Sequence, residues 1–178
     1  MTIIFQHRKD TEFLEYIWKD IQNIKLLDCT KENRCSSKDI RNALYKEKDT
    51  IILVGHGDNY GLLYPDFNGY MIDSRYVNFL RGKKIIAIWC FAKEFTTKYN
   101  LTGFSTGMFI SDKHEAYNFE FDYIDENIIE KENISFALKL NKLLKDNIDY
   151  KEWPNILRKE LNTKEGFVEF NYNSLISL

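Results

Sequence analysis

Apolar runs that end at polar or glycine residues recur along the chain, and they indicate buried strands. The strongest are at residues 50–55 and 84–89, and a third lies at 107–110. Continuous apolar runs of this length are typical of parallel strands that are covered on both faces. An opening run at 2–6 predicts a further strand, and the alternating tail at 167–172 predicts an edge strand.

Segments with helical spacing of apolar residues separate these runs. They lie at 11–24, 37–45, 75–81, 91–97, 126–147 and 154–161. Two short apolar pieces at 62–64 and 69–72 flank a turn and predict a hairpin. Alternation of strands and helices indicates the α/β class, with a mostly parallel central sheet flanked by helices. We expect a single domain over residues 1–178.

Composition and charge exclude several classes of function. A chain of 178 residues can bury an ordinary core without metals or disulfides. The formal net charge of -2 offers no basic surface for nucleic acid. The opening residues do not read as a signal peptide, and no apolar stretch approaches the length of a membrane span. We therefore expect a cytoplasmic protein with no nucleic-acid or membrane partner.

The cysteines and histidines do not form a recognised metal or disulfide pattern. The three cysteines are an odd number, and we expect Cys29 and Cys35 to remain reduced. No CxxC or HExxH spacing occurs, and His7, His56 and His114 are widely dispersed. The sequence predicts no metal and no cofactor.

His56 and Cys90 each follow one of the two strongest strand-like runs. Ligands of open α/β sheets bind beyond the carboxyl ends of the strands, so adjacent strands would bring an imidazole and a thiol to one crevice. Such a pair can act as base and nucleophile, and Gly57 allows a close backbone approach for an oxyanion. The structural alternatives are a strand-end histidine bonded to backbone groups and a thiol that packs as a small hydrophobe.

A strand ending in His-Gly, a crossover, and a strand ending in Cys resemble the caspase-like fold of cysteine peptidases (clan CD, caspase-hemoglobinase fold). The resemblance covers about residues 50 to 116 and implies a three-layer sandwich. It also implies that His56 is the general base and Cys90 the nucleophile, with the amides of Gly57 and Cys90 as the oxyanion hole. The sequence departs from caspases at Phe91-Ala92-Lys93, where caspases have a glycine soon after the cysteine.

The resemblance also implies a specificity pocket near the end of the 107–110 run. Asp112 and Glu115 follow that run and would favour a basic residue at P1, whereas a helix start behind a Ser111 cap explains the same two acids structurally. His114 is a competing base, and a solvated position in a charged run is the favoured reading for it. His7 is a weaker candidate.

The sequence thus predicts a cysteine endopeptidase that acts on a protein or peptide substrate with His56 and Cys90. The alternative from another class is a catalytically inactive caspase-like module that binds a protein partner, favoured by the missing glycine and by the bulky Trp89. A flavodoxin-like nucleotide-binding or receiver domain is a remote third reading, since the chain has neither a glycine-rich phosphate loop nor an acidic cluster at the strand ends.

Overall fold

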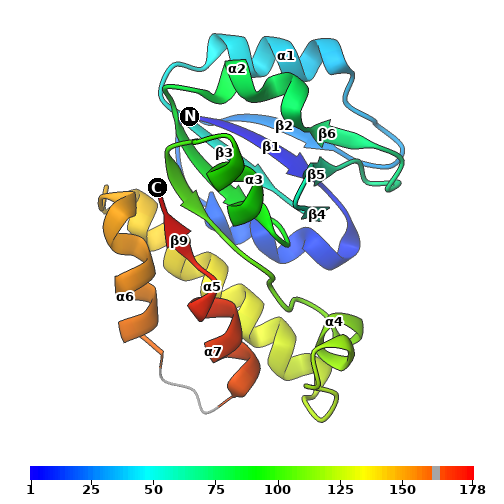
Figure 1. Cartoon of the computed structure of the whole chain (residues 1–178), viewed down its shortest axis with the longest axis vertical. Coiled ribbons are helices and arrows are strands. Elements are labelled where there is room, and N and C mark those ends of the chain that lie inside the picture. Colours follow the sequence, from blue (N-terminus) through cyan, green and yellow to red (C-terminus); the bar gives the residue numbers. More distant parts are fainter. Residues whose placement is uncertain (162–164) are drawn as a thin grey trace.

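The computed structural model describes residues 1–161 and 165–178 and has a six-stranded central sheet (Figure 1). In spatial order the strands are β2 (Lys25–Cys29), β1 (Thr2–Gln6), β3 (Thr50–Val54), β7 (Lys84–Ile88), β8 (Gly103–Ser105) and β9 (Ile176–Ser177). The first five are parallel, and β9 is antiparallel to β8. The predicted α/β class with a mostly parallel central sheet is therefore confirmed.

The two strongest apolar runs are neighbouring parallel strands, as predicted. Thr50 of β3 lies opposite Lys84 of β7, and Val54 lies opposite Ile88. Both strands therefore end at the same edge of the sheet. Side chains alternate between the faces of a strand, and in β3 and β7 both faces are covered. Burial on both sides explains why these runs are apolar throughout.

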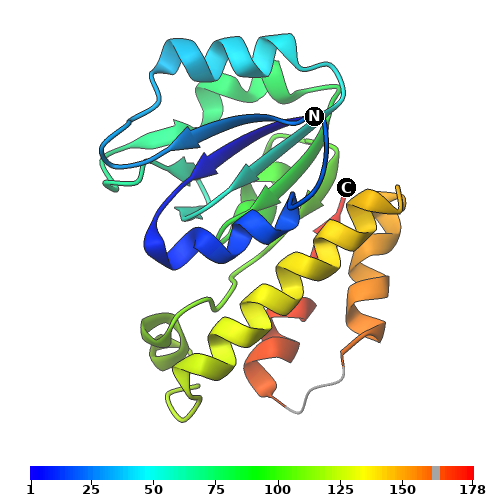
Figure 2. The same cartoon turned by 180° about the vertical axis from the view of Figure 1, so that it is seen from behind.

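Helices cover both faces of the sheet (Figures 1 and 2). On one face pack α1 (Ser37–Lys46), η2 (Ser74–Tyr76), α2 (Val77–Leu80) and α3 (Ala92–Lys98). The other core includes side chains of η1 (Lys9–Ile17), α4 (Lys113–Asn118), α5 (Glu126–Lys145), α6 (Trp153–Lys159) and α7 (Gly166–Asn173), and η3 (Tyr150–Glu152) lies beside them. In the described part of the chain, no helix is both long and apolar enough to cross a membrane.

A small antiparallel sheet follows β3 and confirms the predicted hairpin. It consists of β4 (Gly57–Asp58), β5 (Gly61–Leu63) and β6 (Tyr70–Ile72). Trp89, at the end of β7, donates its indole N–H to Asp58 O at 3.0 Å. The small sheet is thereby attached to the edge of the central sheet where β3 and β7 end.

The predicted strand at 107–110 is wrong, because the third strand of that group is β8 at Gly103–Ser105. Phe109 and Ile110 are buried without strand pairing. Asn171 of α7 replaces the missing strand: its Oδ1 accepts from Ile110 N at 2.7 Å, and its Nδ2 donates to Ile110 O at 2.9 Å. A side-chain amide therefore satisfies backbone groups that a ladder would otherwise pair.

Two other predicted elements differ from the structure. The tail at 167–172 lies within helix α7, where Phe167, Val168, Asn171 and Tyr172 are buried at helical rather than alternating spacing. The expected helix at 11–24 is instead the 3₁₀ helix η1, which ends at Ile17. The left-handed residue Asp20 (φ 63°) lies in the chain that follows and prevents the helix from continuing.

Cys29 and Cys35 form a disulfide, so the expectation that both stay reduced is wrong. The bond joins the end of β2 to the segment before α1, and both cysteines are buried. The loop between β2 and α1 turns back so that the two Cα atoms lie 5.3 Å apart, which spacing alone does not reveal. Cys90 is the free cysteine among the described residues.

Candidate functional site

His56 and Cys90 lie side by side just beyond the ends of β3 and β7. Gly55 N donates to Ile88 O at 3.1 Å, which extends the pairing of the two strands to the residue before His56. Both side chains lie on the face of the sheet covered by η1 and α5, where His56 contacts Asp10 and Cys90 contacts Glu115. As the strand ends predicted, the two residues lie at one edge of the central sheet.

The Cys90 thiol points toward α4. Its Sγ lies 3.5 Å from Phe109 O and 3.4 Å from Glu115 Oε1, and it donates to both oxygens. Burial raises the pKa of Cys90, the charge of Glu115 raises it further, and the contact with Phe109 O opposes them only in part. The thiol is therefore protonated in this conformation. Among the described residues, no contact with His56 stabilises a thiolate at Cys90.

Glu115 connects Cys90 to the start of α4. Its Oε2 accepts from Ser111 N at 2.7 Å and from Ser111 Oγ at 2.9 Å. Burial raises the pKa of Glu115, and these two hydrogen bonds counteract that rise only in part. Asp112, rather than the expected Ser111, caps α4 by accepting from Glu115 N at 2.7 Å. The proposed substrate-binding role of Asp112 and Glu115 stays a prediction.

The imidazole of His56 is enclosed by residues from other segments. Its Nε2 lies 3.2 Å from Asp10 Oδ2, at an angle outside that of a regular hydrogen bond, and its ring centroid is 5.6 Å from that of Phe67. The backbone N–H of His56 donates to Gln6 Oε1 at 2.8 Å. Among the described residues, no hydrogen bond joins His56 to Cys90. The pair is adjacent but uncoupled in this conformation.

Gly57 is required by packing. A Cβ at this position would lie 2.2 Å from Trp89 Cδ1 and 2.4 Å from Gly61 O. The close approach that the sequence predicted is therefore an approach of Trp89 and the small sheet to the Gly57 backbone. Its role in an oxyanion hole stays a prediction.

Among the described residues, neither of the other two histidines has a hydrogen bond or ion pair with Cys90. His114 is exposed on α4, where its Nδ1 lies 3.2 Å from Asn118 Nδ2, as expected for a solvated residue. His7 follows β1, and its Nδ1 lies 3.0 Å from Asp28 Oδ1. Since β3 separates β1 from β7 in the sheet, His56 is the histidine on the strand next to that of Cys90.

Sequence reasoning missed Asp10 and Phe67, which hold the imidazole. Asp10 follows the first strand by four residues, so the rule that applied to His56 and Cys90 would have drawn attention to this segment. Phe67 had no such signal. It lies in the turn between β5 and β6 and reaches His56 because the small sheet folds against the end of β3.

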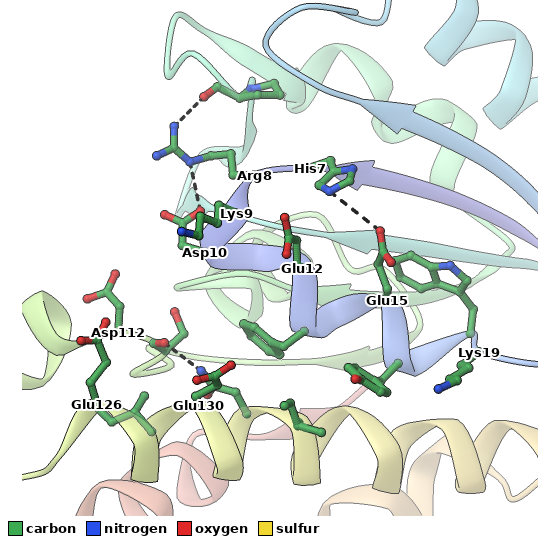
Figure 3. A pocket seen from close by; sticks show the side chains of 18 of the residues that line it. His7, Arg8, Lys9, Asp10, Glu12, Glu15, Lys19, Asp112, Glu126 and Glu130 are labelled. Atoms are coloured by element: carbon green, nitrogen blue, oxygen red, sulfur yellow. Dashed lines mark hydrogen bonds and ion pairs between the residues drawn. The ribbon is translucent and has the colours of Figure 1, made fainter.

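An open groove of about 1500 Å³ runs along η1 and α5 beside this edge (Figure 3). Figure 3 shows Asp112, Glu126 and Glu130 at one end of the groove, with Arg8 and Asp10 across from them. Nine of its lining residues are acidic, against four lysines and arginines. Apolar side chains such as Phe13 and Ile129 also line it. The groove is therefore partly apolar and predominantly acidic.

Within residues 1–161 and 165–178, no group of three or more histidine, cysteine or acidic side chains is arranged to hold a metal ion. Comparisons of the chain with protein-family models, with curated proteins and with solved structures give no match. The geometry of the site is therefore the evidence for a function.

Proposed function

We propose that the protein is a cysteine endopeptidase of caspase-like architecture, with Cys90 as nucleophile and His56 as general base. One observation carries this proposal. His56 and Cys90 follow neighbouring parallel strands at matching positions, and both side chains lie on the same face of the sheet. Neighbouring strands are about 4.8 Å apart, so the imidazole and the thiol extend from adjacent backbone positions.

The proposed reaction has two steps. His56 takes the proton of the Cys90 thiol, and the thiolate attacks the carbonyl carbon of the scissile peptide. The C–N bond then breaks, the leaving amine receives the proton from His56, and a thioester remains on Cys90. Water, deprotonated by His56, hydrolyses this thioester and restores the thiol.

The backbone after Cys90 supports a functional role for this turn. Phe91 has φ 66°, a left-handed conformation that a bulky residue rarely adopts and glycine adopts without strain. Phe91 thus has the backbone conformation of a glycine at the position just after the cysteine. Strained residues of this kind cost about 1–3 kcal/mol and cluster at active sites.

The thiol must leave Glu115 before it can react. In the described conformation it donates to Glu115 Oε1 and Phe109 O, and its pKa is raised. We therefore propose that this is a resting state, and that substrate binding turns Cys90 toward His56. The same contacts favour the second candidate, an inactive caspase-like binding module in which the thiol is structural.

The acidic groove supports a preference for basic substrates. Glu126 and Glu130 are exposed on α5 and line the groove, and within the described residues neither side chain has an ion-pair partner. Their charge is available to lysine or arginine side chains of a bound peptide. We propose that the peptidase prefers Lys or Arg at P1, with Asp112 and Glu115 nearest the nucleophile.

The test is cleavage of fluorogenic peptides that differ only at P1. We expect turnover by the wild type, fastest after Lys or Arg, and a loss of at least about a thousandfold in kcat/KM for both Cys90→Ala and His56→Ala. His114→Ala is the matched control, because this histidine is exposed and has no contact with the thiol. It should retain activity within about twofold.

Two outcomes contradict the proposal. One is a wild type that cleaves no peptide in the panel, and the other is a Cys90→Ala variant that still cleaves. If the alanine variants also melt at a markedly lower temperature, both residues are structural and the binding-module reading replaces the peptidase.

A further inference from the structure

Four side chains form a closed ring of contacts around the candidate base. His56 Nε2 lies 3.2 Å from Asp10 Oδ2, and Arg8 Nε donates to Asp10 Oδ1 at 3.2 Å. The Arg8 guanidinium lies 4.5 Å from the centroid of the Phe67 ring, and that ring contacts the His56 ring at 5.6 Å. Arg8 also donates from Nη1 to Pro65 O at 2.9 Å. Residues from two other segments, 8–10 and 65–67, thus surround one imidazole.

The backbone of His56 is fixed as well. Gln6 Oε1 accepts from its N–H at 2.8 Å. Gly55, just before it, has φ 139°, and a Cβ there would lie 2.4 Å from Gln6 Cβ. The glycine and Gln6 together determine where His56 leaves the strand, and the ring of contacts determines where its imidazole points.

Asp10 determines which nitrogen of His56 carries the hydrogen. Nε2 is buried from solvent, and a buried polar atom without a partner costs about 1–3 kcal/mol. Asp10 is the group within reach, and an ionised carboxylate can only accept a hydrogen bond. Although burial acts to raise the pKa of Asp10, the nearby His56 and Arg8 lower it below its ordinary value, so the carboxylate is ionised at neutral pH.

We propose that Asp10 is a positioning residue that keeps His56 in the Nε2–H tautomer and leaves Nδ1 as the atom that takes the Cys90 proton. The second half of this statement rests on the proposed peptidase function. The first half concerns the free protein and can be tested without a substrate. Such orientation of a base by a third group is a general feature of activated nucleophiles.

The tautomer can be read directly by NMR. In protein labelled with ¹⁵N at histidine, two-bond ¹⁵N–¹H correlations show which ring nitrogen carries the hydrogen in the neutral imidazole. The spectrum of His56→Ala identifies the His56 signals by their loss. We expect Nε2–H in the wild type, and a mixture of both tautomers in Asp10→Ala. Nδ1–H in the wild type, or an unchanged tautomer in Asp10→Ala, overturns the proposal.

Kinetics test the link to catalysis. We expect Asp10→Ala to lower kcat by about 10- to 100-fold with KM within about twofold, and Asp10→Asn to lower it less, because the amide oxygen can still accept from Nε2–H. Asp146→Asn is the control, since Asp146 is an exposed residue just beyond the carboxyl end of α5. It should not change kcat. A loss confined to KM, or Asp10→Ala activity equal to wild type, overturns the positioning role.

The NMR and kinetic experiments together also distinguish a failure of this proposal from a failure of the proposed peptidase function. A wild type without turnover contradicts the proposed function, and the NMR spectrum then decides the Asp10 assignment alone. A wild type with turnover and an unaltered Asp10→Ala variant contradicts only the role of Asp10.

Discussion

Removing the charge of Glu115 should make the Cys90 thiol more reactive. The two groups are 3.4 Å apart, and at an effective dielectric constant of about 20 a thiolate and a carboxylate at that distance repel by about 5 kcal/mol. The raised pKa of Glu115 means that this carboxyl shares some of the repulsion by taking up a proton. We therefore expect Glu115→Gln to lower the pKa of Cys90 by about one to two units, at 1.36 kcal/mol per unit.

The expected rate follows from two opposing effects. A decrease of about one to two units in pKa gives about 10- to 100-fold more thiolate at pH 8, whereas the intrinsic nucleophilicity falls with a Brønsted coefficient of about 0.4–0.5. The net expectation is alkylation about three- to tenfold faster than in the wild type.

Intact-mass spectrometry with iodoacetamide measures this rate. Without reductant the Cys29–Cys35 disulfide persists, so an adduct on the folded protein reports Cys90. Glu130→Gln is the matched control, because it removes a carboxylate charge from the neighbouring groove at a residue that has no contact with the thiol. Equal rates for Glu115→Gln and the wild type over pH 7 to 10, or the same acceleration in Glu130→Gln, would refute the electrostatic argument.

Three further predictions concern stability. Asn171→Ala should lower the free energy of unfolding by about 2–4 kcal/mol in urea titrations, because both backbone groups of Ile110 lose their partner. Asn173→Ala is the control, because Asn173 is exposed on the same helix. Equal effects of the two substitutions would contradict the explanation. Reduction of the Cys29–Cys35 bond should lower the free energy of unfolding by about 2 kcal/mol, as expected for a loop with a sequence separation of 6. A melting temperature that reductant leaves unchanged would contradict this prediction. Burial acts to raise the pKa of Glu47, but hydrogen bonds, the largest from the Asp49 N–H, lower it to about 2. Glu47 therefore contributes roughly 3 kcal/mol to the free energy of unfolding above about pH 4.5, and this contribution is lost as the pH falls toward 2. Glu47→Gln should weaken the dependence of stability on acid pH in urea titrations. An acid profile identical to that of the wild type would contradict this prediction.

Much of the framework follows from local sequence. The runs at 50–55 and 84–89 are apolar throughout because both faces of β3 and β7 are covered, and this property is visible without a structure. The helix at Glu126–Lys145 is equally visible from its spacing. The placement of His56 and Cys90 at one edge follows from the parallel order of those strands, so their adjacency was predictable.

Local pattern failed where a distant partner replaced the usual one. The 107–110 run is apolar because it is buried, yet Asn171, which is 61 positions from Ile110, pairs its backbone in place of a strand. The tail that carries Asn171 is helical because its buried side chains are spaced so that only a helix places them on one face, toward Ile110 and the core.

The sequence by itself thus determined the α/β class, the two central strands and the edge of the sheet at which Cys90 and His56 lie. Only the tertiary structure decided that Cys90 donates to Glu115, that His56 is held by Asp10, and that Cys29 is bonded to Cys35. The physical reason is the range of the interactions. The burial of a strand is visible in consecutive apolar residues. A hydrogen bond or an ion pair instead depends on the close approach of side chains from segments that only the packed fold brings together.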